Sequence, residues 1–126
     1  MMQSRQILPK SILVVDDDPD IVDFLRELLE MEGYSVATTA RIDYIEGLPK
    51  RNLPDLILLD VFLSGNDGRD LVKYIKSQEG TRPIPVIMFS AHPGVETSVR
   101  AAGADDFLAK PFDLDELLKK IEAYLF

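Results

Sequence analysis

Short strand-like segments recur along the chain, and apolar residues at helical spacing fill the stretches between them. Four of the segments are nearly unbroken apolar runs, and the fifth is more polar but rich in β-branched residues. They lie at residues 12–15, 35–39, 56–59, 86–89 and 107–109. Runs of this length and uniform apolar character predict strands that are buried on both faces of a sheet.

The stretches between the strands carry signals for helices. Asp18 suits an N-cap and Pro19 the first helical position, and Gly33 provides a stop for this first helix. Its apolar side is expected to consist of Ile21, Leu25, Leu28 and Leu29. Further helices are predicted within residues 40–53, where Gly47 and Pro49 keep the helix short, through 71–75, over 95–102 and from 113 onward.

This alternation predicts an α/β fold with five βα units. Because the strands are apolar throughout, we expect a doubly wound, five-stranded parallel sheet covered by helices on both faces. The chain shows no internal repeat and no linker-like stretch. It is therefore expected to form a single domain over residues 1–126, without a separate effector domain.

Polar residues follow four of the predicted strands at the point where each strand ends. Asp16 and Asp17 follow the first strand, Asp60 the third, Ser90 the fourth and Lys110 the fifth. In an open parallel sheet the ligand crevice lies outside the carboxyl ends of the strands. A single Asp at such a place often only caps a helix, but we expect this complementary set to form a site.

The identities of these residues suit phosphoryl transfer onto a carboxylate. Three neighbouring carboxylates repel one another, and a hard divalent cation such as Mg²⁺ relieves that repulsion. Lys110 can pair with a carboxylate or a phosphoryl oxygen, and the Ser90 hydroxyl can donate to a phosphoryl oxygen. Catalysis of such a transfer is mostly positioning and charge neutralisation.

Composition and charge exclude several classes of function. The chain has 126 residues, no cysteine, 14 Lys and Arg, and 22 Asp and Glu, which gives a net charge of −8. The acidity disfavours direct nucleic-acid or anionic-membrane binding, and the lack of cysteine excludes disulfides and thiolate chemistry. The sequence contains neither a signal-peptide pattern nor an apolar run of the roughly 20 residues that a membrane helix needs. We expect a cytoplasmic protein.

These residues, in this order and spacing, resemble the receiver domain of two-component response regulators. The resemblance covers a core from about Ile12 to Leu125 and implies a flavodoxin-like fold. The matching positions are Asp16-Asp17, Asp60, Asp67-Gly68, Ser90-Ala91, Gly103-Ala104-Asp105-Asp106-Phe107 and Lys110-Pro111-Phe112.

The resemblance implies a phospho-acceptor and a Mg²⁺ site. Asp60 would accept the phosphoryl group. Asp17 would bind Mg²⁺ directly, and Asp16 would hold it largely through water. The backbone carbonyl of Phe62 would be the third protein ligand of the metal, beside the carboxylate of Asp60.

It also implies a switch. Lys110 would contact the phosphoryl group, and Ser90 would swing inward to hydrogen-bond to it. Phe107 holds the position of the family's switch aromatic and would move inward behind Ser90. This motion would reshape the surface made by the fourth helix, the fifth strand and the fifth helix.

The implied partners are proteins. A sensor histidine kinase or a histidine phosphotransfer protein would donate the phosphoryl group. A downstream effector protein, or a C-terminal output domain outside this chain, would read the switch. The surface of the fourth helix, fifth strand and fifth helix is also expected to allow a homodimer.

The chain departs from the family in the loop after the acceptor. Met-Pro is common there, whereas this chain has Leu63-Ser64. Replacing Pro with Ser removes a preset φ angle, so we expect a looser loop around the Phe62 carbonyl. Phe62 and His92, two residues beyond Asp60 and Ser90, are predicted to flank the phosphoryl group and limit its access to water.

Two other classes of function fit part of the pattern. A Mg²⁺-dependent phosphatase that forms an aspartyl phosphate usually needs an acid/base carboxylate two residues after the nucleophile, where this chain has Phe62. It also needs a cap, for which 126 residues leave no room. A receiver-like scaffold that signals without phosphate is the other alternative, and loss of an acidic residue or the lysine would support it. A phosphohistidine relay through His92, the single histidine, is less expected than a solvated loop residue.

Overall fold

A computed structural model describes residues 8–47 and 52–126 of the chain. The elements in chain order are β1 (Ser11–Val15), α1 (Pro19–Met31), β2 (Ser35–Thr39), α2 (Ile42–Glu46), β3 (Leu56–Asp60), β4 (Phe62–Leu63), β5 (Asn66–Asp67), α3 (Gly68–Ser77), β6 (Val86–Ser90), η2 (Pro93–Val95), α4 (Glu96–Ala101), β7 (Asp106–Ala109) and α5 (Leu114–Leu125).

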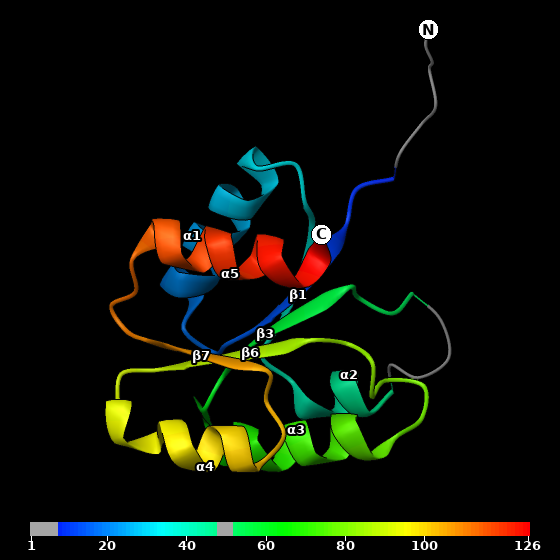
Figure 1. Cartoon of the computed structure of the whole chain (residues 1–126), viewed down its shortest axis with the longest axis vertical. Helices are drawn as coiled ribbons and strands as arrows, with labels where there is room; N and C mark the ends of the chain where they lie inside the picture. Colours follow the sequence, from blue (N-terminus) through cyan, green and yellow to red (C-terminus); the bar gives the residue numbers. More distant parts are fainter. Residues whose placement is uncertain (1–7, 48–51) are drawn as a thin grey trace, which may run out of the picture.

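The main sheet has five parallel strands in the order β2-β1-β3-β6-β7. Helices α1 and α5 cover one face, and α2, α3 and α4 cover the other (Figure 1). This confirms the predicted α/β fold with a doubly wound parallel sheet. The strand order places β1 and β3 side by side at the centre, where the direction of winding reverses.

Each strand contributes alternate residues to two separate cores, because successive side chains point to opposite faces. On β1, Ile12 and Val14 pack under α1 and α5, whereas Leu13 and Val15 pack over α2, α3 and α4. On the helices, Leu25 of α1 and Leu117 of α5 complete the first core, and Leu71 of α3 the second. Burial on both faces accounts for the unbroken apolar runs.

The helix ends also follow the sequence signals. Asp18 caps α1 by accepting a hydrogen bond from the Asp20 N–H (3.0 Å), and Pro19 is the first helical residue. Gly33 follows the helix with a φ of +95°, which strongly favours glycine. Asp113 caps α5 through the N–H groups of Asp115 and Glu116.

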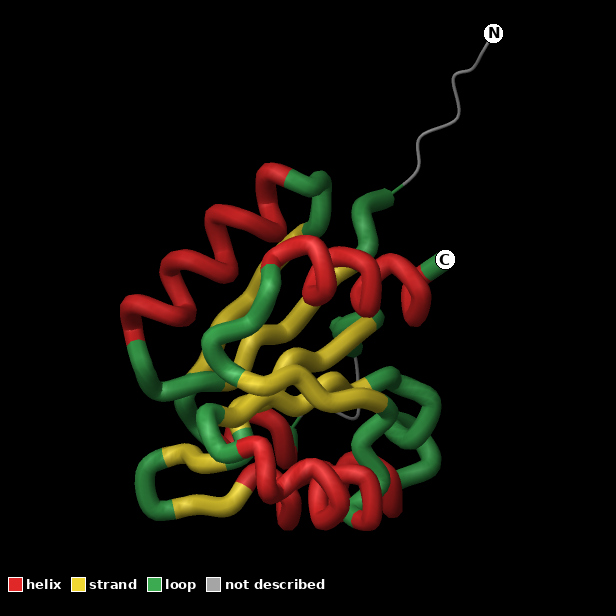
Figure 2. The backbone as a smooth tube through the Cα atoms, turned by 60° about the vertical axis from the view of Figure 1, so that its left-hand side comes forward, coloured by secondary structure: helices red, strands yellow, loops and turns green. Residues whose placement is uncertain are grey.

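Several details differ from the sequence-based expectation. The segment after Asp60 is a small antiparallel hairpin, β4 paired with β5, set apart from the main sheet (Figure 2). The fourth helix is shorter than expected, because residues 93–95 form a 3₁₀ turn and the α-helix covers only Glu96–Ala101. The last strand begins one residue earlier, at Asp106.

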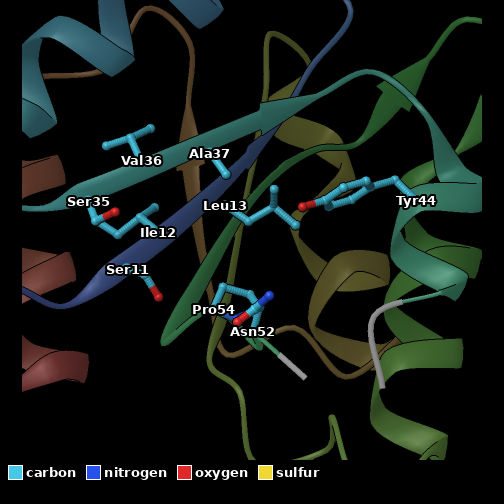
Figure 3. A pocket seen from close by; sticks show the side chains of 9 residues that line it. All are labelled: Ser11, Ile12, Leu13, Ser35, Val36, Ala37, Tyr44, Asn52 and Pro54. Carbon is cyan, nitrogen blue, oxygen red and sulfur yellow. The ribbon is translucent and has the colours of Figure 1, made fainter. Parts of the chain in front are cut away.

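A cavity of about 90 Å³ lies near the start of β1 and β2, at the opposite end of the sheet from Asp16. Tyr44 reaches toward it from α2, in the direction of Leu13 (Figure 3). The residues that line it within the described ranges include none that is acidic or basic. In the two described ranges, no helix has the length and apolar character required to cross a membrane.

Candidate functional site

The carboxyl ends of the two central strands bring three carboxylates together. Asp16 and Asp17 follow β1, and Asp60 is the last residue of β3. One oxygen from each lies within 4.8 Å of the others. Asp16 and Asp60 are 2% and 8% exposed, whereas Asp17 lies at the surface. The sheet topology therefore assembles the predicted acidic cluster.

Neighbouring backbone groups orient two of these carboxylates. Oδ1 of Asp16 accepts a hydrogen bond from the Asp18 N–H (2.9 Å), and Oδ2 of Asp17 accepts one from the Ser64 N–H (2.7 Å). Each of these bonds uses one carboxylate oxygen, so Oδ2 of Asp16 and Oδ1 of Asp17 are not engaged by it. The hairpin that begins with β4 thus anchors Asp17, which lies 47 positions away in sequence.

Lys110 reaches into the cluster from the end of β7. Its Nζ lies 3.5 Å from Oδ2 of Asp16 and 3.6 Å from Oδ2 of Asp60. The ammonium also lies 4.9 Å from the centre of the Phe89 ring, and the Lys110 N–H donates to the Ser90 carbonyl (2.8 Å). The cation is placed to balance part of the negative charge of the two buried carboxylates.

Burial and charge act in opposite directions on Asp60 and Asp17. Burial, reinforced by the charge of Asp16, raises the pKa of Asp60 to about 6, although Lys110 and the Phe62 N–H oppose the rise. Hydrogen bonds from Ser64 hold the pKa of Asp17 below its usual value. The ionised form of Asp17, which can bind a cation, is thus favoured. The ionised form of Asp60 is disfavoured unless a cation lies nearby.

Gly68 allows the backbone to pass close to Asp60. A Cβ at this position would lie 2.5 Å from the Asp60 carbonyl oxygen and 3.1 Å from that of Val61. The Gly68 N–H donates to the Val61 carbonyl (2.6 Å), which closes the loop that carries the hairpin. The close approach therefore requires glycine at position 68, and Asp67 before it caps α3.

The predicted switch residues, Ser90 and Phe107, are both buried. Ser90 is 1% exposed, and its Oγ accepts a hydrogen bond from the His92 N–H (3.0 Å). Phe107 is 7% exposed and packs in the core under α3 and α4, so its ring lies inside the protein in this structure. The inward motion proposed for both residues stays a prediction.

The predicted output surface consists of α4, β7 and α5, where β7 is the fifth strand of the main sheet. Asp106 joins all three elements. Its carboxylate accepts hydrogen bonds from Arg100 of α4 (3.1 Å) and from Lys120 (3.1 Å) and Tyr124 (3.3 Å) of α5. Asp106 also precedes Phe107, whose N–H it binds (2.9 Å). One carboxylate, beside the predicted switch aromatic, therefore links the three elements.

Phe62, two residues after Asp60, and His92, two residues after Ser90, lie together with ring centres 5.3 Å apart in an edge-to-face arrangement. Two further contacts were not predicted from the sequence. Ser64 binds Asp17, and the guanidinium of Arg69 lies 5.3 Å from the centre of the Phe62 ring. No short-range pattern marks either contact, because both depend on the path of the hairpin.

The donor set of the site fits Mg²⁺. Three carboxylates with oxygens within 4.8 Å, one of them with a raised pKa, leave an excess of negative charge that Lys110 only partly balances. Hard oxygen ligands and incomplete neutralisation are what Mg²⁺ requires. The arrangement can hold such a cation next to a carboxylate that becomes a nucleophile once it is ionised.

Comparison with known proteins agrees with this geometry. A family model described as the response regulator receiver domain matches residues 12–122. The chain is 40% identical over 118 residues to the DNA-binding dual master transcriptional regulator RpaA of Synechocystis, covering 90% of this chain and 48% of that protein. It is 39% identical over 121 residues to the phosphate regulon regulatory protein PhoB of Rhizobium meliloti, covering 94% and 53%.

Solved structures show the same fold. The response regulator TrrA of Thermotoga maritima, solved in complex with Mg²⁺ and BeF, has 30% identity and a TM-score of 0.82, covering 92% of this chain and 99% of that one. The receiver domain of NtrX from Brucella abortus has 36% identity and a TM-score of 0.81, covering 90% and 97%. The chain spans about half the length of the two transcriptional regulators. The chain belongs to the response regulator receiver domain family of two-component signalling.

Proposed function

We propose that this chain is a phosphorylation-dependent signalling switch that accepts a phosphoryl group on Asp60. The observation that carries the proposal is the cluster of Asp16, Asp17 and Asp60, whose oxygens lie within 4.8 Å, with Lys110 3.6 Å from Asp60. Membership of the receiver family supports the same reading. The chain would act only on its own aspartate, and not as an enzyme on an external substrate.

The metal in this proposal is Mg²⁺. Asp17 and Asp60 would bind it, Asp16 would hold it through water, and the Phe62 carbonyl would add a backbone ligand. When bound, Mg²⁺ supplies positive charge that favours ionised Asp60 and offsets the charge of the incoming phosphoryl group. The Mg²⁺ complex of TrrA from Thermotoga maritima supports this choice of metal.

The transfer step itself is a displacement at phosphorus. An oxygen of ionised Asp60 attacks the phosphorus of a phosphohistidine, the P–N bond breaks, and the electron pair returns to the imidazole nitrogen, which takes up a proton. The product is an aspartyl phosphate and a free histidine. Lys110 pairs with a phosphoryl oxygen, and Ser90 exchanges its bond from the His92 N–H for a bond that its hydroxyl donates to the phosphoryl group.

The output is a change of the surface formed by α4, β7 and α5. Ser90 lies on β6 beside β7, and Phe107 on β7 directly follows Asp106, which joins the three elements. Movement of Ser90 and Phe107 would therefore reach Arg100 and Lys120. This surface would bind an effector protein, an output domain outside this chain or a second copy.

The donor would be a histidine kinase or a histidine phosphotransfer protein in the cytoplasm. Neither nucleic acid nor membrane is a direct partner in this proposal, because a net charge of −8 repels both. The transcriptional regulators to which the chain is similar support an output in gene regulation through a separate part of the protein.

The test is phosphorylation by a small acyl-phosphate donor with Mg²⁺, read by intact mass beside an Asp60→Asn variant. We expect one added phosphoryl group that is labile to hydroxylamine and absent in the variant or with a chelator. Release of many phosphates per chain from a phosphomonoester would instead indicate a phosphatase. Mg²⁺ binding without any adduct, from either the small donor or a phosphohistidine protein, would indicate a scaffold.

A further inference from the structure

Phe62 lies two residues after Asp60, and its side chain is 42% exposed. An exposed phenylalanine at the start of a two-residue strand has little core packing to fix its position. Two neighbours hold it: the His92 ring at 5.3 Å and the Arg69 guanidinium at 5.3 Å from its centre. The ring therefore lies in a stack that joins the acceptor loop to the loop after Ser90.

Arg69 is itself fixed at both ends of its guanidinium. Its Nε and Nη2 donate to the carboxylate of Asp67 at 2.9 and 2.6 Å, and its Nη1 donates to the Ser98 hydroxyl of α4 at 2.9 Å. The Arg69 side chain is 25% exposed, so this arrangement is partly shielded from water. A cation held in this way favours one position of the aromatic ring over others.

We propose that Arg69 is a positioning residue that holds the Phe62 ring over the acceptor and thereby sets the lifetime of phosphorylated Asp60. This inference rests on the proposed function. It goes further in assigning a role to a residue that touches neither the acidic cluster nor Lys110.

The step that Arg69 controls is hydrolysis of the aspartyl phosphate. Water attacks the phosphorus in line with the bond to Asp60, the P–O bond breaks, and the electron pair returns to the Asp60 carboxylate. The water proton leaves with the solvent or with the inorganic phosphate that forms. The Phe62 N–H bonds to the Asp60 carboxylate, so the ring that follows it borders the path by which water reaches the phosphorus.

The bond to Ser98 extends this control to α4. Helix α4 is part of the proposed output surface, and Ser98 is its exposed contact with Arg69. A partner that engages the Ser98 hydroxyl would release one end of the guanidinium and loosen the Phe62 ring. Phosphoryl lifetime would then depend on whether α4 is occupied.

The test compares hydrolysis rates in a double-mutant cycle. The parent, Arg69→Met, Phe62→Ala and the double variant are phosphorylated with a small acyl phosphate, the donor is removed, and the remaining adduct is followed by intact mass. Loss of a cation–π contact of ordinary strength corresponds to a rate increase of about two- to fivefold for Arg69→Met. In the Phe62→Ala background the same change should have no effect, since there is no ring to hold.

Arg41→Met is the matched control, because Arg41 also pairs with an aspartate two residues away but lies far from Phe62 in sequence and on a different element. It should leave the hydrolysis rate unchanged. Ser98→Ala should raise the rate in the same direction as Arg69→Met, by a smaller factor. Thermal unfolding and Mg²⁺ titration of each variant identify any general loss of structure.

Equal acceleration by Arg69→Met with and without the Phe62 ring would overturn the inference, as would no acceleration at all. Both results presuppose a phosphorylated parent and leave the proposed function standing. A parent that never carries phosphate would instead overturn the proposed function.

Discussion

Asp16 and Asp60 are carboxylates inside a protein whose other buried residues are almost all apolar. Burial disfavours the charged form, and here two such groups face one another with one lysine between them. Without a metal, the negative charges of the two carboxylates therefore conflict with their burial and with each other. That conflict favours cation binding, because a divalent ion stabilises both anions at once.

The raised pKa of Asp60 predicts how the stability of the metal-free protein depends on pH. Folded Asp60 has a pKa of about 6, above the ordinary value of 3.8 expected when unfolded. Between these values the folded state binds more protons, so stability rises as the pH falls from 7 toward 5. The gain from this group between pH 7 and pH 5 should be about 1 kcal/mol.

Urea unfolding in the presence of a chelator, at pH 7 and at pH 5, measures this effect. The Asp60→Asn variant should lose the difference, because its side chain does not titrate. Saturating Mg²⁺ should also reduce the difference, since the metal favours the ionised carboxylate at pH 7. The stability change from pH 7 to pH 5 is compared between the two proteins. If the parent gains no more stability than the Asp60→Asn variant over this range, the prediction is wrong.

At the scale of elements, the hairpin of β4 and β5 explains a departure from the family. Other receiver domains commonly have Pro where this chain has Ser64, and the sequence alone suggests that the serine makes the loop looser. The structure shows a further effect: the Ser64 N–H donates to Asp17, which proline, lacking an N–H, cannot do. The serine thus supplies an anchor between the hairpin and a proposed metal ligand.

Ser64→Pro should therefore weaken Mg²⁺ binding, by about tenfold if the loss resembles that of other outer hydrogen bonds to metal ligands. Ser64→Ala keeps the N–H and is the matched control, with a smaller loss expected. Titration of Mg²⁺ by calorimetry measures both variants. Equal affinities for the proline variant and the parent would show that the Ser64 N–H does not position Asp17.

At the scale of the whole molecule, α1, the loop after β6 and the loop after β7 together form a groove of about 510 Å³ beside the acidic site. Phe24 of α1 is 48% exposed and lines it with Phe112 and Leu114, and Lys110 borders it as well. An apolar groove that shares Lys110 with the proposed phosphoryl site is a suitable place for the proposed donor protein to dock.

Phe24→Ala should accordingly slow phosphoryl transfer from a phosphohistidine protein by about tenfold, as expected for an aromatic contact residue at an interface. Phosphorylation by a small acyl phosphate should be unchanged, because that donor needs no docking surface. Met31→Ala, at the far end of α1, is the control, since Met31 is also exposed. Equal slowing with both kinds of donor would point to damage of the site instead.

Much of this protein follows from the order of its residues. The strands, the cap at Asp18 and the polar residues at the strand ends depend on neighbours in sequence, so they can be predicted without a structure. The parallel sheet then implies that Asp16, Asp17, Asp60 and Lys110 meet, because carboxyl ends of parallel strands share one edge.

Other features were decided only by the tertiary structure. They include the bond from Ser64 to Asp17, the contact of Arg69 with the Phe62 ring, and the links from Asp106 to α4 and α5. Each of these joins residues that lie on different segments of the fold. If the loops followed another path, the same residues would lie solvated at the surface without these contacts. Side-chain contacts of this kind depend on ångström-scale backbone placement, and local periodicity does not contain that information.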